Sequence, residues 1–151
     1  MRVRTSVAVL SVLCLTSVLL LCGCSAEVRD YQDALADWSQ TLSSSPAPEM
    51  QHDQSGKATG YDASEVTAYR DTLHNLLDQL EGITPPQALA AEHAQVVAAF
   101  SGVCDKEGQF WDAFFEGDTR ASTEAGDAIE AQMDEFNAAW KQLTEASDEA
   151  R

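Results

Sequence analysis

The sequence predicts an all-α protein that folds as an antiparallel four-helix bundle. In four separate segments the apolar residues recur at alternating spacings of three and four, which places them along one face of a helix. No segment shows the sustained two-residue alternation of a half-buried strand. Only Gly82 and Ile83 separate the second segment from the third, so these helices are expected to fold back as a tight hairpin. A three-helix core with a loosely docked first helix is the alternative.

The first helix is expected over about residues 26–44. Its apolar seam consists of Val28, Tyr31, Leu35, Trp38 and Leu42. The following stretch, about 45–61, contains serine, proline and glycine and has too little apolar surface to pack. We therefore expect a flexible loop there.

The second helix is expected to begin at Asp62, whose carboxylate can accept hydrogen bonds from the first backbone amides. Glu65, three residues later, completes a capping box. The seam of this helix continues from Val66 to Ile83 at the same spacing. Gly82 is expected to end the helix in the left-handed conformation that a side chain would resist.

The third helix is expected to start with a capping box at Thr84-Pro85-Pro86-Gln87 and to run to about Glu116. Gly117-Asp118 then closes it and caps a fourth helix over about 119–146. The last two helices would each be about 45 Å long and the first two nearer 30 Å, at about 1.5 Å per residue. A long hairpin covered by two shorter helices is the expected arrangement.

The N-terminal segment has the layout of a secretory signal peptide. Arg2 and Arg4 precede an apolar run over residues 7–21 that contains no charged side chain. As a helix this run would span about 22 Å, short of the roughly 30 Å hydrocarbon core of a bilayer. Cleavage is therefore expected, which assigns residues 1–23 to the signal peptide and 24–151 to an acidic helical-bundle domain.

The apolar run stops at Leu21-Cys22-Gly23-Cys24, which resembles the lipobox of bacterial lipoproteins. The resemblance implies cleavage between Gly23 and Cys24, a diacylglycerol on the Cys24 sulfur, and N-acylation, for example by palmitate, as a further option. With the Ile83–Pro86 junction and a histidine in the next helix, the chain is similar to small helical-bundle lipoproteins of uncharacterised function. A lipid-anchored protein on the extracytoplasmic face of the cell membrane or outer membrane is expected.

The chain is strongly acidic, with 25 Asp and Glu against 9 Lys and Arg and a formal net charge of −16. Nucleic acid is not an expected partner, because binding its phosphates requires clustered Lys and Arg. The membrane is expected to hold the protein through the lipid anchor alone. Beside Cys24 the mature chain has only Cys104, which excludes an intramolecular disulfide and predicts a buried, inert thiol.

Few residues suggest chemistry. His93 interrupts the apolar seam of the third helix and is the one candidate ligand, although a packed structural histidine is the preferred interpretation. Glu107 lies about 21 Å further along the same helix and cannot share a site with it. The sequence contains neither metal-ligand spacing in a helix nor a legible nucleophile and base. We therefore expect no catalytic residue, no metal and no cofactor.

Phe110, Trp111, Phe114 and Phe115 cover more than one side of the third helix, which marks either a deeply central helix or an exposed apolar surface. The leading hypothesis is a lipid-anchored, non-enzymatic interaction module of the cell envelope that binds an envelope protein or self-associates through this surface. The alternative is an envelope ligand- or metal-binding bundle with a pocket between helices, near His93 and the aromatics.

Overall fold

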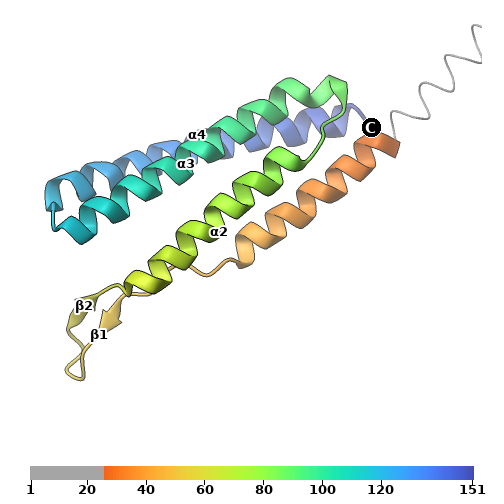
Figure 1. The fold of residues 1–151 in the computed structure, drawn as a ribbon. Coiled ribbons are helices and arrows are strands. Elements are labelled where there is room, and N and C mark those ends of the chain that lie inside the picture. The colour runs from red at the N-terminus through yellow and green to blue at the C-terminus, as the bar shows by residue number, and fades with distance from the viewer. Residues whose placement is uncertain (1–25) are drawn as a thin grey trace, which may run out of the picture.

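A computed structural model describes residues 26–151 and shows an all-α bundle of four helices, as predicted (Figure 1). The residues expected to form the signal peptide, the expected cleavage site and Cys24 lie outside the described residues. The helical elements in chain order are an N-terminal helix described over 26–44, α2 (Ala63–Gly82), a short 3-10 helix (Gln87–Leu89), α3 (Ala90–Glu116) and α4 (Thr119–Glu149). Within residues 26–151, no helix is both long and apolar enough to cross a membrane.

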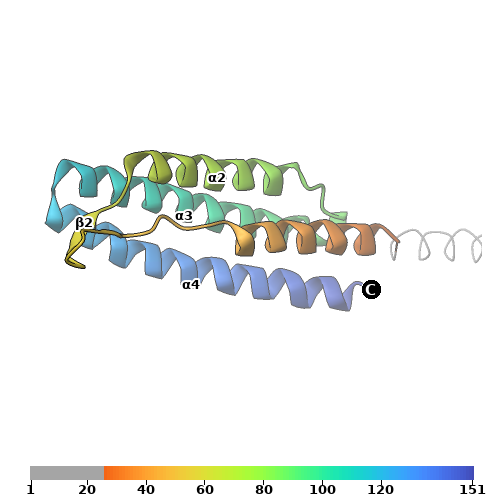
Figure 2. The same cartoon turned by 90° about the horizontal axis from the view of Figure 1, so that it is seen from below.

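α3 and α4 form a long antiparallel hairpin, along which the N-terminal helix and α2 lie as a shorter pair (Figures 1 and 2). The 27 residues of α3 extend about 40 Å, whereas residues 26–44 extend about 28 Å. The N-terminal helix therefore covers only the part of the hairpin nearest the C-terminus. Residues 45–50, the strap, continue as extended chain toward the distal end of the bundle, which holds the α3–α4 turn (Figure 2).

The N-terminal helix is an integral part of the core, so the alternative of a loosely docked first helix is wrong. Its seam residues Val28, Tyr31, Leu35 and Trp38 are only 3–4% exposed, and Leu42 is partly buried against the same core. Trp38 contacts each of the other three helices. Its ring centroid lies 5.2 Å from that of Phe100 in α3 and 6.2 Å from that of Phe136 in α4. Its Nε1 donates a 2.8 Å hydrogen bond to the Leu76 carbonyl of α2.

Three of the expected helix caps are present, at Asp62, Gly117 and Asp118. The Asp62 carboxylate accepts hydrogen bonds from the backbone amides of Ser64 and Glu65 at the start of α2. Gly117 adopts a left-handed conformation with φ of 76°, which closes α3. Asp118 then accepts from the Ala121 amide at 2.9 Å and caps α4. Gly117 and Asp118 together form the turn between α3 and α4 at the distal end of the bundle.

The junction between α2 and α3 differs from the prediction in both of its caps. Gly82 is not left-handed; the helix ends because Ile83 is extended and its N–H bonds to the Leu80 carbonyl. The Thr84–Gln87 capping box is absent, and α3 begins only at Ala90 after the 3-10 turn. A residue before proline is forced away from the helical region, and here Thr84 and Pro85 both precede one. The helix therefore cannot start before Pro86.

The stretch expected to be an unstructured loop contains a small β-hairpin. Strand β1 (Gln51–His52) pairs antiparallel with β2 (Ala58–Gly60). The Asp53 carboxylate organises the turn by accepting from the backbone amides of Ser55 at 2.8 Å and Lys57 at 3.0 Å. Strands this short carry no detectable alternation, which is why the sequence pattern does not predict them.

The small residues of α3 and α4 allow the two helices to approach closely. A Cβ on Gly102 of α3 would lie 2.6 Å from the Gln132 side chain of α4. A Cβ on Gly126 of α4 would contact the Phe110 ring at 3.9 Å. Phe110 of α3 therefore lies beside Gly126 of α4, at the α3–α4 interface.

Candidate functional site

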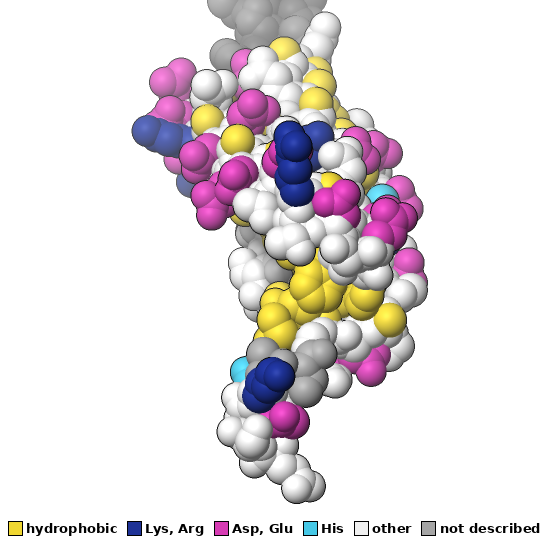
Figure 3. All heavy atoms as spheres, turned by 90° about the vertical axis from the view of Figure 1, so that its left-hand side faces the viewer, with side chains coloured by type: hydrophobic (Ala, Val, Ile, Leu, Met, Phe, Trp, Pro, Cys, Tyr) yellow, Lys and Arg dark blue, Asp and Glu magenta, His cyan; other side chains and the backbone are white. Residues whose placement is uncertain are grey.

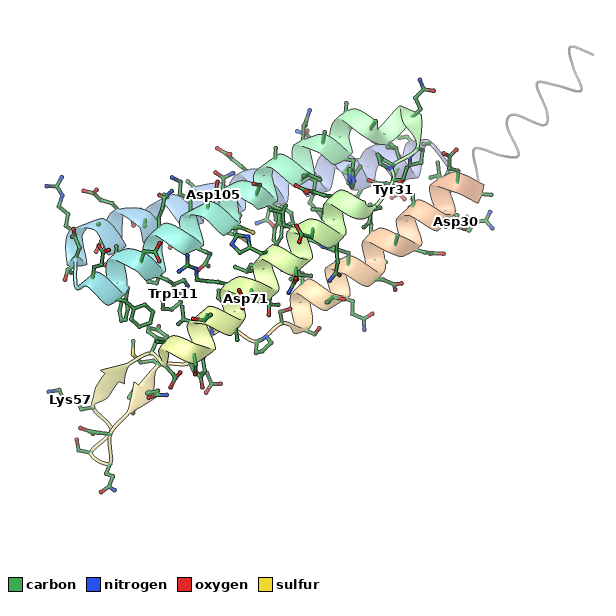
Figure 4. All side chains as sticks on the ribbon, viewed as in Figure 1. Asp30, Tyr31, Lys57, Asp71, Asp105 and Trp111 are labelled. Atoms are coloured by element: carbon green, nitrogen blue, oxygen red, sulfur yellow. The ribbon has the colours of Figure 1, made fainter. Side chains whose placement is uncertain are left out.

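The aromatic residues predicted as an interaction surface lie in the last turns of α3, where Figure 4 labels Trp111. Their exposures differ widely. Trp111 is buried, with 5% of its surface exposed, whereas Phe115 is 48% exposed. Phe110 and Phe114 are half-buried. The sequence allowed either a deeply central helix or an exposed apolar surface, and both descriptions apply to part of the cluster. Trp111 belongs to the packed interior, and Phe115 belongs to the surface.

Tyr61, which lies between β2 and α2, completes this aromatic cluster. Its ring centroid is 4.9 Å from that of Trp111 and 5.4 Å from that of Phe114, with edge-to-face geometry in both pairs. Such pairs contribute about 0.5–1.5 kcal/mol beyond the burial of their area. Apolar side chains gather between the hairpin and the helices in Figure 3. Tyr61 thus joins the base of the hairpin to α3.

A cleft of about 300 Å³ opens beside the aromatic cluster. Its lining includes Pro48 of the strap, Tyr61, Tyr69 of α2, and Glu107, Phe110 and Trp111 of α3. A second hollow of about 350 Å³ adjoins it and shares Pro48 and Tyr69. Both hollows lie where the N-terminal helix has ended and the strap runs in its place. An extended strap fills less volume than a helix, which leaves this space open.

Glu107 is the ionisable group of the cleft, and it is half-buried. Its Oε2 accepts a 3.0 Å hydrogen bond from Trp111 Nε1, and its Oε1 accepts one from the Tyr69 hydroxyl at 3.4 Å. Among residues 26–151, no Lys, Arg or His nitrogen lies within 4.0 Å of this carboxylate. The nearby Arg70 instead pairs with Asp112 at 2.7 Å. Glu107 therefore keeps an uncompensated charge between aromatic rings.

Burial dominates the electrostatics around Glu107. It raises the pKa of the Glu107 carboxyl above its usual range, and the hydrogen bonds from Trp111 and Tyr69 oppose that shift. Burial, aided by the neighbouring Glu107 charge, also raises the pKa of Tyr69 to about 12. The Tyr69 hydroxyl is consequently protonated at neutral pH and serves as a donor. A positive charge in the cleft would favour the ionised form of Glu107.

His93 lies far from this cleft, in the first turns of α3, and is packed into the core. It is 6% exposed, and its Nδ1 lies 2.8 Å from the Tyr31 hydroxyl oxygen of the N-terminal helix. Burial lowers the pKa of His93, so its ring is neutral at neutral pH. Tyr31 and Trp111 lie toward opposite ends of the bundle (Figure 4). The fold therefore separates His93 from the distal aromatic cluster, and the hollow that His93 does line contains Glu81 and Val97 instead.

Cys104 has the buried position that the sequence predicts. Its Sγ lies 3.8 Å from the Leu73 carbonyl oxygen, and 4% of the residue is exposed. Burial raises its pKa to about 11, so the group is a thiol at neutral pH. In the part of the chain that the structure describes, no three His, Cys, Asp or Glu side chains are placed to hold a metal ion.

The sequence pattern did not single out Glu107 or Tyr61 as site residues. Glu107 lies four residues before Trp111 on α3, a spacing that brings its carboxylate beside the indole N–H and is a signal that the sequence contains. Tyr61 carried no local signal, because its position depends on the hairpin. Comparisons of the chain with family models, curated proteins and solved structures give no match.

Proposed function

We propose that this protein is a lipid-anchored, non-enzymatic binding protein of the cell envelope that presents its distal aromatic surface to a partner protein. The observation that carries the proposal is the position of that surface. The N-terminal helix begins at residue 26, close to Cys24 in the sequence, at one end of the bundle, and the C-terminal end of α3, which carries Phe115, lies near the other end (Figure 1). The length of α3, about 40 Å, separates the two ends.

The chemistry of the surface supports a protein partner with apolar side chains and a basic rim. Phe115 is 48% exposed, and half-buried Phe114 contacts the rings of both Phe115 and half-buried Phe110. Exposed apolar patches on a folded chain are typical of interaction sites. The net charge of −16 favours approach by a basic protein. Self-association through the same surface is the other outcome.

The anchor is tested by Cys24→Ala. The substitution is expected to abolish incorporation of labelled palmitate and to leave the precursor uncut, because the sulfur that would carry the diacylglycerol is removed. Metabolic labelling followed by gel electrophoresis measures both effects. Cys104→Ala, which removes a buried thiol, is the matched control and is expected to retain the label. Labelling that persists in Cys24→Ala would contradict the lipid anchor.

The interaction surface is tested by Phe115→Asp in the full-length, membrane-bound protein. The charge is expected to reduce cross-linking to the partner at least tenfold while helicity is unchanged, because an exposed ring is replaced. Met133→Asp is the control, since Met133 is 37% exposed but lies in α4, outside the aromatic cluster. Sedimentation of the purified protein separates self-association from a second protein. Equal cross-linking of both variants would exclude this surface.

A further inference from the structure

The cleft beside the aromatic cluster offers a carboxylate with unused hydrogen-bonding capacity. Glu107 accepts from Trp111 and Tyr69, whereas an ionised carboxylate has about four acceptor positions. Arg70 of α2, which follows Tyr69, forms its ion pair with Asp112 and not with Glu107. The cleft therefore contains a negative charge that the described residues do not neutralise.

The walls of the cleft are aromatic and stand at steep angles to one another. The Tyr61 ring is inclined 82° to the Trp111 indole, and the Phe110 ring is inclined 80° to it, each with its centroid 4.9 Å away. Tyr69 adds a fourth aromatic side chain from α2. Faces of aromatic rings attract cations within about 6 Å, and several rings around one site form the cages that recognise alkylammonium groups.

We propose that this cleft binds an alkylammonium cation, with Glu107 as its counter-charge and the rings of Tyr61, Tyr69, Phe110 and Trp111 as its walls. This inference goes beyond the lipid-anchored binding role and holds whether or not Cys24 is acylated. The volume of about 300 Å³ lies at the lower end of the range for small-ligand sites, about 300–1,000 Å³, and suits a single ammonium head group.

Charge and desolvation both favour an organic cation over the alternatives. A metal such as calcium requires about six to eight oxygen ligands, and this cleft contributes one carboxylate and two tyrosine hydroxyls. A neutral apolar ligand would leave the Glu107 charge uncompensated. An alkylammonium group neutralises that charge and places its methyl or methylene groups on the rings, which relieves the cost that burial imposes on the ionised carboxyl.

The test is a calorimetric titration of the full chain, purified in a maltoside detergent, with choline and n-butylammonium. The neutral carbon isostere of choline, 3,3-dimethylbutan-1-ol, is titrated in parallel. Glu107→Gln removes the charge but keeps the shape and an oxygen acceptor for Trp111. Asp105→Asn is the matched control, because Asp105 is an exposed acid two residues earlier on the same helix. Tyr61→Leu removes one aromatic wall at a half-buried position.

We expect saturable binding of at least one of the two cations, and binding of the isostere at least tenfold weaker. Glu107→Gln and Tyr61→Leu are each expected to weaken cation binding at least tenfold, and Asp105→Asn less than twofold. Circular dichroism checks that each variant is folded. If Glu107→Gln does not fold, the result for Tyr61→Leu decides the test. Vesicles of phosphatidylcholine, titrated beside free choline, separate a lipid head group from a free cation. Absence of cation binding, or equal binding of the isostere, would overturn the proposal.

Discussion

Trp38→Ala is expected to lower the free energy of unfolding by about 3–5 kcal/mol, the range for truncating a buried aromatic side chain. Trp38 is 3% exposed and packs against Phe100, Phe136 and Trp140. Its indole also bonds to the Leu76 carbonyl, so one side chain joins the N-terminal helix to the other three. Because domains of this size are stable by about 5–15 kcal/mol in total, the loss would leave a marginal fold. Urea denaturation followed by circular dichroism measures it.

Trp38→Phe separates the packing of Trp38 from its hydrogen bond. The phenyl ring keeps most of the contact with Phe100 but loses the Nε1 donor, and we expect a smaller loss of about 1–2 kcal/mol. The Leu76 carbonyl lies within α2, where the helix provides another donor, so no acceptor is stranded. If Trp38→Ala lowers the free energy of unfolding by less than about 1 kcal/mol, the N-terminal helix contributes little to the stability of the core. That result would favour a three-helix core with a loosely docked first helix.

The helices themselves could be predicted because their pattern is local. Spacings of three and four placed Tyr31, Leu35 and Trp38 on one face, and the structure buries all three. The caps at Asp62 and Gly117 followed from backbone chemistry that a single residue supplies. Caps supplied by one residue therefore agree with the structure at these two positions, whereas the caps expected at Gly82 and Thr84 do not form.

Predictions failed where two local rules competed. At residues 84–87 the capping signal of threonine and glutamine opposed the steric effect of two consecutive prolines, and the prolines prevailed. A capping hydrogen bond contributes about 1 kcal/mol, whereas the clash with a proline ring strongly disfavours the helical conformation of the preceding residue. The steric restriction therefore outweighs the capping signal at this junction.

The candidate site could be predicted only in part because it combines residues that are distant in sequence. Phe110 to Phe115 were recognisable as an unusual aromatic run on one helix. Their partner Tyr61 comes from the hairpin, and the cleft exists because the N-terminal helix ends before the distal end of the bundle. The difference in helix length follows from the sequence, but the position of the hairpin beside α3 is not encoded in the spacing within one segment.

Trp111→Ala is expected to lower the free energy of unfolding by about 3 kcal/mol, at the lower end of the range for buried aromatics, because the end of a bundle can relax into the space. Trp111 packs against Tyr61 and Phe110 and donates to Glu107. Its loss therefore removes the contact that holds Tyr61 and the base of the hairpin against α3. It also leaves the half-buried Glu107 carboxylate with only the longer hydrogen bond from Tyr69. We expect the damage to be concentrated at the distal end.

Hydrogen exchange distinguishes this local effect from the global effect of Trp38→Ala. In Trp111→Ala, amides at the end of α3 and the start of α2 are expected to exchange faster, while those around Trp38 keep their order of protection. Phe115→Ala is the control, because a side chain that is 48% exposed contributes about 0.5 kcal/mol or less. Uniform acceleration in all four helices would show that Trp111 supports the whole bundle. The cleft would then be part of the global core, and its aromatic walls would owe their placement to stability alone.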